Sequence, residues 1–189
     1  MPAVLINPPA SEPLSLADAK KFLRVEHDDD DDVILSIIGA ARGYIESHTR
    51  TALITQTWRL VRDAWPANGV VRVVPAPVQS VSAARVYDGE HSAIDIDPGV
   101  FVADLATSEI CAPAFSLPQP GRAKAGIEMD VVIGFGDQAE DVPAPLRQAV
   151  RHLVAHWYEN RGLAVVGHNV ALMPASVNAM LTAYRVVSL

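Results

Sequence analysis

The sequence predicts an α+β fold, in which a small helical bundle is built from both chain ends and an antiparallel β domain is inserted between them. Apolar residues recur at helical spacing near both ends, whereas the middle consists of short runs rich in Val, Ile, Thr and aromatic residues, separated by Pro and Gly. We therefore expect a helical core from residues 1–51 and 140–173, an inserted β domain over 52–139, and a separate short helix over 174–189.

Composition and charge exclude several classes of protein. The 189 residues are 50% apolar and 20% charged, as in a folded soluble protein. The formal net charge of −7 argues against a protein whose main task is to grip nucleic-acid phosphate, since that affinity comes from Lys and Arg. A single cysteine, Cys111, rules out an internal disulfide. We find no signal-peptide pattern and no membrane-spanning apolar run, so we expect a soluble, unprocessed chain.

Two helices are expected after a Pro-rich arm. In "SLADAKKFLRV", Ser15 can cap the first helix, and Asp18 lies where a capping acid belongs. The acidic run Asp28 to Asp32 precedes and begins the second helix, where negative charge is favoured by the helix dipole. A buried stripe is expected along this second helix. Its members are Ile34, Ile37, Ile38, Ala41, Ile45 and His48.

The β domain is expected to hold five to seven strands. They are read from "ALITQTWRLVRDAWP", "GVVRVVPAP", "VQSVSAARVYDG", "SAIDIDPGVFVADL" and "GIEMDVVIGFG". The stretch "CAPAFSLPQPGRAKAG" is expected to be a loop, because Pro113, Pro118, Pro120 and Gly121 interrupt regular structure within it.

The chain then returns to helix. Val142-Pro143 sets the start of a long helix, and Gly162 is placed to stop it. Leu146, Val150, Leu153 and Trp157 share one face of this helix and predict a packing role. A looser segment leads to a last helix within "SVNAMLTAYRVV". Its apolar face consists of Val177, Met180, Leu181 and Tyr184.

Two histidines on the long helix have the spacing of zinc ligands. His152 and His156 are four residues apart, and Glu159 follows one turn later. A hydrolytic zinc helix places Glu directly after the first His, but that position is Leu153 here. Ordinary histidines beside an apolar stripe are therefore favoured over a metal-dependent hydrolase.

Other candidate sites also have structural interpretations. The acidic run lacks the alternating ligands and central Gly of a helix-loop-helix calcium loop. "GFGDQ" lacks the Lys and Ser or Thr of a phosphate-binding loop, and Glu140 and Asp141 would repel phosphate. Cys111 has no His nearby in sequence. We therefore expect no catalytic residues, no bound metal, no cofactor and no enzyme activity.

Several segments taken together resemble the phage head–tail connector (adaptor) family. "GFGDQAEDVPAPLRQAVRHLVAHWYENRG" has its Gly-aromatic-Gly strand end, its Val-Pro and a helix that ends in Tyr158-x-x-Arg161. "LMPASVNAMLTAYR" resembles its closing pattern, with Met180-Leu181 where a Leu pair is usual. "SLADAKKFLRVEHDDDDDVILSIIGAARGYIES" resembles its opening helices. Because a β domain is inserted between these segments, the chain resembles the branch of the family that is found in long-tailed phages, prophages and gene transfer agents.

The resemblance implies a structural ring, typically of twelve copies, at the head–tail neck of a virion or phage-like particle assembled in the bacterial cytoplasm. Its partners would be the portal protein, a tail terminator or neck (stopper) protein, other copies of itself, and double-stranded DNA that passes without sequence-specific binding; no membrane is implied. The ring would extend the DNA channel and provide a platform for the tail. The alternative is a tail-completion or neck protein one layer lower.

Three groups of residues are expected to serve this role. The last helix would dock into the portal, because a short isolated helix cannot bury its own apolar face and would gain by lying in a groove on a partner. The alternative is that this helix packs on its own subunit. The docking residues would be Pro174, Val177, Met180, Leu181, Tyr184 and Arg185. The core helix would use Leu146, Val150, Leu153, Trp157, Tyr158 and Arg161. Acids that could face the channel are Asp28, Asp29, Asp30, Asp31 and Asp32, since a negative lining would not hold DNA.

Overall fold

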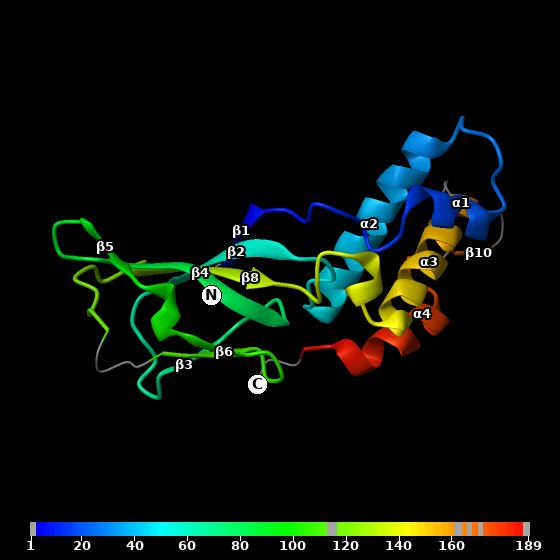
Figure 1. Ribbon diagram of the computed structural model, residues 1–189. Coiled ribbons are helices and arrows are strands. Elements are labelled where there is room, and N and C mark those ends of the chain that lie inside the picture. The colour runs from blue at the N-terminus through cyan, green and yellow to red at the C-terminus, as the bar shows by residue number, and fades with distance from the viewer. Residues whose placement is uncertain (1–2, 113–116, 161–163, 166–167, 170–171, 187–189) are drawn as a thin grey trace. The chain divides into compact units, whose positions relative to one another are not determined.

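The computed structural model describes residues 3–112, 117–160, 164–165, 168–169 and 172–186. The chain divides into a β unit, Met1–Ala10 with Thr55–Phe135, and a helical unit, Ser11–Ile54 with Gly136–Leu189 (Figure 1). The expected α+β class is confirmed, because helices form near both ends of the chain and antiparallel sheets form in its middle. The expected helical core over 1–51 needs correction, because the first ten residues belong to the β unit.

The larger sheet of the β unit has five strands in the order β1-β2-β8-β4-β5, and every neighbouring pair is antiparallel. The strands are β1 (Ala3–Asn7), β2 (Gln56–Arg62), β8 (Ile127–Ile133), β4 (Val78–Tyr87) and β5 (Ala93–Ile96). The outer strand β1 lies in the Pro-rich arm, where the sequence analysis named no strand. It pairs with β2, with Val4 opposite Arg59.

A smaller sheet lies below the first in Figure 1 and has the order β3-β7-β6. Its strands are β3 (Val70–Arg72), β7 (Glu109–Cys111) and β6 (Val102–Asp104), and a short 3-10 helix, Pro98–Val100, precedes β6. Residues from both sheets form the apolar core of the unit. This core includes Leu60, Val71, Val86, Ile110, Ile127, Met129, Val131 and Ile133, of which Leu60 is 6% exposed and the others at most 1%.

The other face of the five-stranded sheet is polar, and an ion-pair network crosses it. The Arg59 guanidinium donates to the Asp130 carboxylate at 2.7 and 2.9 Å and lies 3.3 Å from Glu128. The hydrogen bond that Arg59 donates to Asp130 is the largest cause of the raised pKa of Arg59. Tyr87 donates to Glu128 at 3.1 Å. Alternation of these residues with the buried ones along β8 follows from the two-residue period of a strand.

The first two helices begin close to where the sequence predicts. In α1 (Leu16–Leu23), the Ser15 hydroxyl accepts from the backbone N–H of Asp18 at 3.1 Å. The helix α2 (Asp31–Thr49) begins after Asp30, which makes no side-chain cap hydrogen bond. Arg24 and Arg50 end the two helices in the left-handed conformation, with φ of 58° and 59°.

The remaining helices come from the second half of the chain. A 3-10 turn, Ala139–Asp141, leads through Pro143 into α3 (Ala144–Glu159). Two short strands, β9 (Ala164–Val165) and β10 (His168–Asn169), pair with each other. The helix α4 (Ala175–Leu181) continues as a 3-10 turn over Thr182–Tyr184. Gly162, the predicted stop signal for α3, lies outside the described residues. No helix in the described ranges is both long and apolar enough to cross a membrane.

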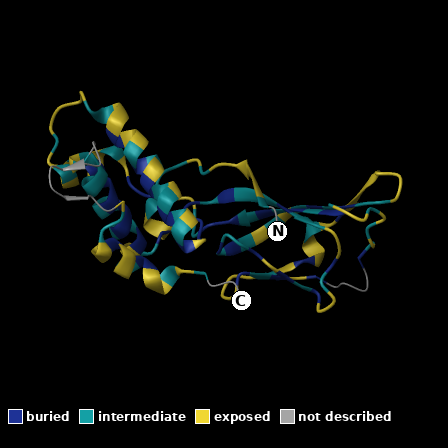
Figure 2. Ribbon diagram, turned by 180° about the vertical axis from the view of Figure 1, so that it is seen from behind, coloured by how far each residue is buried: buried dark blue, intermediate teal, exposed yellow. Residues whose placement is uncertain are grey.

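The core of the helical unit lies between α2, α3, α1 and α4, as the buried faces in Figure 2 show. From α2, Ile34, Ile38, Ala41 and Ile45 are fully buried, whereas Ile37 and His48 of the predicted stripe are only half-buried. The side chains of α2 that point away from the core include two exposed large residues, Val33 and Leu35.

A carboxylate–guanidinium cluster fastens the segment before α1 to α2. The Arg42 Nε donates to Glu12 at 2.8 Å, and its Nη1 donates to Glu46 at 2.9 Å. Burial lowers the pKa of Arg42, but the two carboxylates outweigh that effect and raise it. Glu46 also accepts from the backbone N–H of Leu53 at 2.8 Å. The same cluster therefore connects α2 both to the segment before α1 and to the segment that follows α2.

Candidate interaction site

The predicted core helix α3 packs as a strut of the helical unit. Leu146, Val150 and Leu153 are fully buried, as the shared face predicts. Trp157, one turn further on, is half-buried; its ring meets Tyr44 of α2 edge-on at 5.6 Å. The indole Nε1 donates to the backbone carbonyl of Leu172 at 2.8 Å, which ties the end of α3 to the segment before α4.

Tyr158 links the end of α3 to the start of α2. Its hydroxyl donates to the Asp30 carboxylate at 2.6 Å, although the two residues are far apart in sequence. Arg161, the last residue assigned to the core helix, lies outside the described residues.

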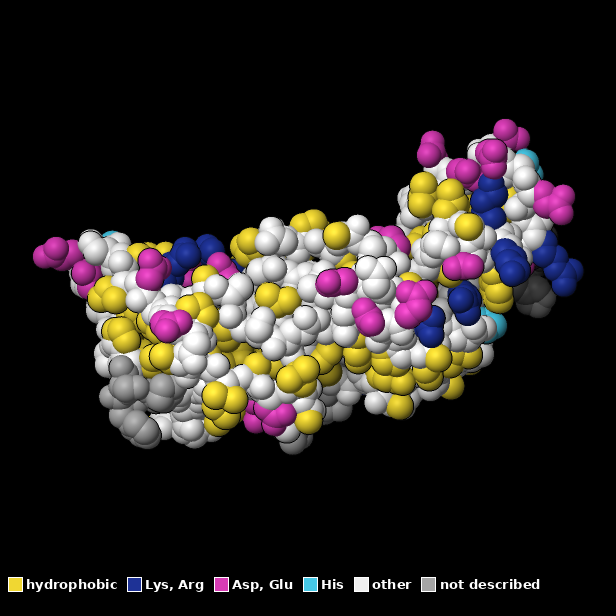
Figure 3. All heavy atoms as spheres, viewed as in Figure 1, with side chains coloured by type: hydrophobic (Ala, Val, Ile, Leu, Met, Phe, Trp, Pro, Cys, Tyr) yellow, Lys and Arg dark blue, Asp and Glu magenta, His cyan; other side chains and the backbone are white. Residues whose placement is uncertain are grey.

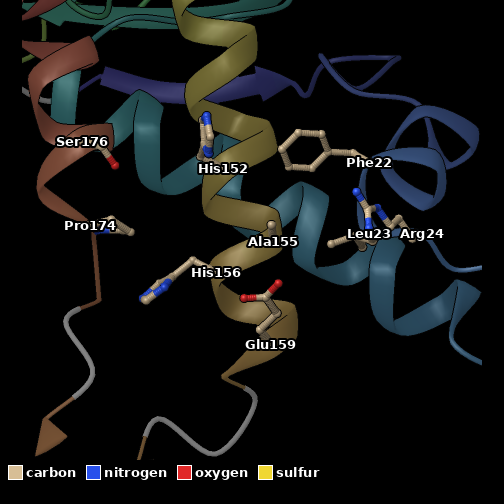
Figure 4. Close-up of a pocket in the computed structure, with 9 residues that line it drawn as sticks. All are labelled: Phe22, Leu23, Arg24, His152, Ala155, His156, Glu159, Pro174 and Ser176. Carbon is tan, nitrogen blue, oxygen red and sulfur yellow. The ribbon is translucent and has the colours of Figure 1, made fainter.

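The histidines of α3 line a pocket of about 520 Å³ in the helical unit (Figure 4). Phe22 of α1 points toward His152, with the ring centroids 5.8 Å apart and the planes at 88°. The His152 Nε2 lies 2.9 Å from the side-chain nitrogen of Gln148. His156 and Glu159 lie further along α3, and Pro174 and Ser176 form another wall.

The pocket lacks the arrangement of a metal centre. Within the described ranges, no group of three or more His, Cys, Asp or Glu side chains is arranged to hold a metal ion. His152 instead contacts an aromatic ring and an amide, which is how a partly buried structural histidine is accommodated. This geometry gives the hydrolase alternative no support.

The acidic run is partly neutralised within the chain. Lys20 Nζ lies 2.6 Å from both Asp28 and Asp31, and the hydrogen bond from Lys20 is the largest cause of the lowered pKa of Asp28. Asp30 accepts from Tyr158, as described above. The side chain of Asp29 is 96% exposed, and Asp32 is also exposed. Figure 3 shows carboxylates gathered around the connection between α1 and α2, beside Lys and Arg side chains.

The C-terminal segment is divided between a buried and an accessible side. Val177 and Leu181 are fully buried within the helical unit, where α4 packs on α3. Pro174, Met180 and Tyr184 are half-buried, and Arg185 is exposed. The sequence predicted one apolar face shared by four of these residues; in the structure two of them serve the subunit's own core.

Hydrogen bonds fix the end of this segment to the end of α2. Thr51 Oγ1 donates to the Tyr184 carbonyl at 3.1 Å, and the Val186 N–H donates to the Thr49 carbonyl at 2.9 Å. Asn178 lies 3.3 Å from the His48 ring nitrogen. The face of α4 turned away from the core is exposed and uncharged. It consists of Ala175, Ser176, Asn178 and Ala179, followed by Thr182 and Ala183.

The glycines of "GFGDQ" serve a tight turn. Gly134 has a φ of 119°, and a Cβ on Gly136 would collide with the Asp141 side chain. That carboxylate accepts from the Gln138 N–H at 2.9 Å within a capping box. The conformation therefore requires glycine for steric reasons, in agreement with the structural interpretation of the motif.

The family model that matches this chain is described as "Phage gp6-like head-tail connector protein", and the match covers residues 13–84 and 121–185. The chain belongs to this family. The expected resemblance is thereby confirmed, and so is the expectation of a structural protein that is not an enzyme. No curated protein sequence matches this connector protein.

Solved structures from gene transfer agent (GTA) particles are similar to this connector over its whole length. A chain from "Neck of empty GTA particle computed with C6 symmetry" is 29% identical, with a TM-score of 0.83, and 100% of this chain and 97% of that chain are covered. A chain from "Virion of native gene transfer agent (GTA) particle" is also 29% identical, with a TM-score of 0.81 and the same coverage. A third, from "Neck of native GTA particle computed with C12 symmetry", is 28% identical, with a TM-score of 0.78 and the same coverage.

One surface of this connector escaped the sequence analysis. The strand β1 exposes Val4, Leu5 and Ile6 at an edge of the larger sheet. The sequence signal was present in the run "AVLIN", but the run is short and is followed by Pro8-Pro9. Its pairing partner β2 is also distant in sequence, which local patterns do not reveal.

Proposed function

We propose that this connector forms a ring beneath the portal in the neck of a phage-like particle, extends the DNA channel and provides the platform for the tail. The observation that carries the proposal is the full-length likeness to chains from GTA necks. The family model leaves out residues 85–120, which hold β5, β6 and β7, whereas the neck chains match this part as well. The likeness thus supports the GTA-like branch.

The ring would contain several identical copies, and we propose twelve. Relatives were resolved in necks treated with C6 and C12 symmetry, and both are compatible with a ring of twelve. Cyclic rings are built from heterologous contacts, in which each copy uses two different surfaces.

The C-terminal segment Pro174–Leu189 is proposed as the portal-docking element. Its accessible side would make the contact through the members of the predicted set that their own subunit leaves partly or fully exposed, which are Pro174, Met180, Tyr184 and Arg185. Val177 and Leu181 would hold α4 in place from behind, since both are fully buried. The exposed face of α4, which begins at Ala175, is uncharged, so a partner that covers it does not have to bury an unpaired charge there.

The acids between α1 and α2 are proposed to face the DNA channel. Asp28 and Asp29 are 89% and 96% exposed in their side chains, and the whole chain carries −7. A negative lining gives DNA no counterion-release gain, so DNA would slide past it. Lys20 balances part of this charge, which leaves Asp29 and Asp32 as the strongest contributors.

Electron cryo-microscopy of purified particles tests these positions. We expect density for both units of this chain in a ring between the portal and the tail, with the α4 surface against the portal and Asp29 toward the channel axis. Density for this chain one layer lower would favour the tail-completion alternative. Density with Asp28 to Asp32 turned away from the axis would contradict the channel assignment alone.

A further inference from the structure

The edge strand β1 is an unusual surface for a folded protein. Val4, Leu5 and Ile6 are 51%, 43% and 41% exposed, although all three are large apolar residues. Within the described ranges, β1 pairs on one side only, with β2. Its other side presents backbone N–H and C=O groups together with apolar side chains.

Natural proteins protect such edges against pairing with other chains. They do so with charged side chains, especially Lys, with Pro, with β-bulges, or by covering the edge. None of the residues Ala3–Asn7 is charged and none is Pro, and the register irregularity of β1 falls between Leu5 and Asn7. The regular edge over Ala3–Leu5 therefore lacks this protection and is suited to accept another strand.

The opposite edge of the same sheet is formed by β5, which is also exposed. Ile94 is 43% exposed, and Asp95 has a side chain that is 87% exposed. Among the described strands, the sheet therefore ends in two different open edges, β1 on one side and β5 on the other. Two different complementary surfaces at opposite ends of one element are what a head-to-tail contact between identical copies requires.

We propose that the five-stranded sheets of neighbouring copies join edge to edge, with β1 of one copy pairing with β5 of the next. This inference rests on the proposed ring and names the contact that would continue around it. The occupant is a second copy of this chain, because the same sheet supplies both edges and because relatives were resolved in necks with cyclic symmetry.

Symmetry fixes the direction of the new pair. Five strands that alternate in direction leave β1 and β5 running the same way. Neighbours in a twelve-fold ring are related by a rotation of only about 30°. Such a rotation cannot reverse a strand, so the pair between copies is parallel.

The register of the sheet shows which side chains would meet. Val4 is opposite Arg59, Arg59 is opposite Asp130, and Asp95 is opposite Arg85 on the same polar face. Ala93 and Asp95 therefore share a face with Val4, whereas Ile94 points to the other face.

Disulfide trapping in assembled particles tests the proposal. In a Cys111→Ser background, we pair Val4→Cys with Ala93→Cys in one variant and with Asp95→Cys in another, because the two cover adjacent registers. Paired strands bring Cα atoms within disulfide range, about 4.4–6.8 Å. Mild oxidation should convert most of the chain in at least one variant into a ladder of covalent multimers that disappears on reduction.

Matched controls use the same strands. Val4→Cys with Ile94→Cys places the thiols on opposite faces and should give at least about tenfold less cross-linking, since the sheet separates them. Val4→Cys alone should give no dimers; dimers there would indicate β1 pairing with β1 and would overturn the proposal.

The readouts separate this inference from the proposed function. Tailed particles that contain the variant chain, yet yield only monomers with both same-face pairs, would overturn the edge-to-edge contact and leave the ring intact. Tailed particles that lack the chain in their necks would overturn both.

Discussion

A variant in which both Met180 and Tyr184 are replaced by aspartate is expected to bind the portal at least about a hundredfold more weakly. Both side chains are half-buried on α4, and the proposed contact would cover the rest of their apolar surface. Interface residues that anchor in this way contribute about 2 kcal/mol or more each, and each 1.4 kcal/mol corresponds to a tenfold change in affinity. Calorimetry or surface binding kinetics with the purified chain and purified portal measures the effect.

The matched control replaces the same residues conservatively, as Met180→Leu with Tyr184→Phe. This variant keeps the apolar volume and should bind within a few-fold of the unchanged chain. Thermal unfolding of both variants establishes that the helical unit is intact. A folded aspartate variant that binds portal as well as the control does would refute the docking assignment.

A second large effect is expected on stability. Leu153→Ala should lower the free energy of unfolding of the helical unit by about 2–5 kcal/mol, because it removes buried methyl groups and leaves a cavity. Leu153 lies on α3, which packs against α1, α2 and α4, and its side chain is fully buried. Urea unfolding followed by circular dichroism gives the change directly.

Leu35→Ala is the control, since it makes the same chemical change on α2 at a side chain that is 47% exposed. Its effect should stay within about 0.5 kcal/mol, as for most surface substitutions. If the two variants unfold at the same urea concentration, α3 is not the strut that the structure indicates.

The helical part of the fold was largely readable from local signals. Ser15 caps α1 as its residue type predicts, and Pro143 precedes α3 as expected. The spacing of Leu146, Val150 and Leu153 identified the buried face of α3. These features depend on residues a few positions apart, which is the range over which sequence patterns carry information.

The β unit shows where this information ends. The run "AVLIN" becomes a strand only because it pairs with β2, fifty or more positions further on. The strand β7, Glu109–Cys111, begins just before the stretch predicted as a loop and is held by β3 and β6. Such pairings are decided by tertiary contacts rather than by the strand itself.

The C-terminal segment illustrates a different limit. Helical periodicity placed Val177, Met180, Leu181 and Tyr184 on one face, but periodicity does not say what covers that face. In the structure α4 packs on α3, Val177 and Leu181 are fully buried, and the other two stay partly accessible. Likewise, the net charge could not reveal that Lys20 and Tyr158 engage three of the five consecutive acids.

Removal of this chain from the assembling particle tests the central claim, that it joins head to tail. Without the chain, we expect separate heads and tails, and heads that do not retain their packaged DNA; supplying the intact chain should restore joined particles. Electron micrographs and the nuclease-protected DNA content provide the counts. Joined particles with normal DNA content in the absence of the chain would contradict the account.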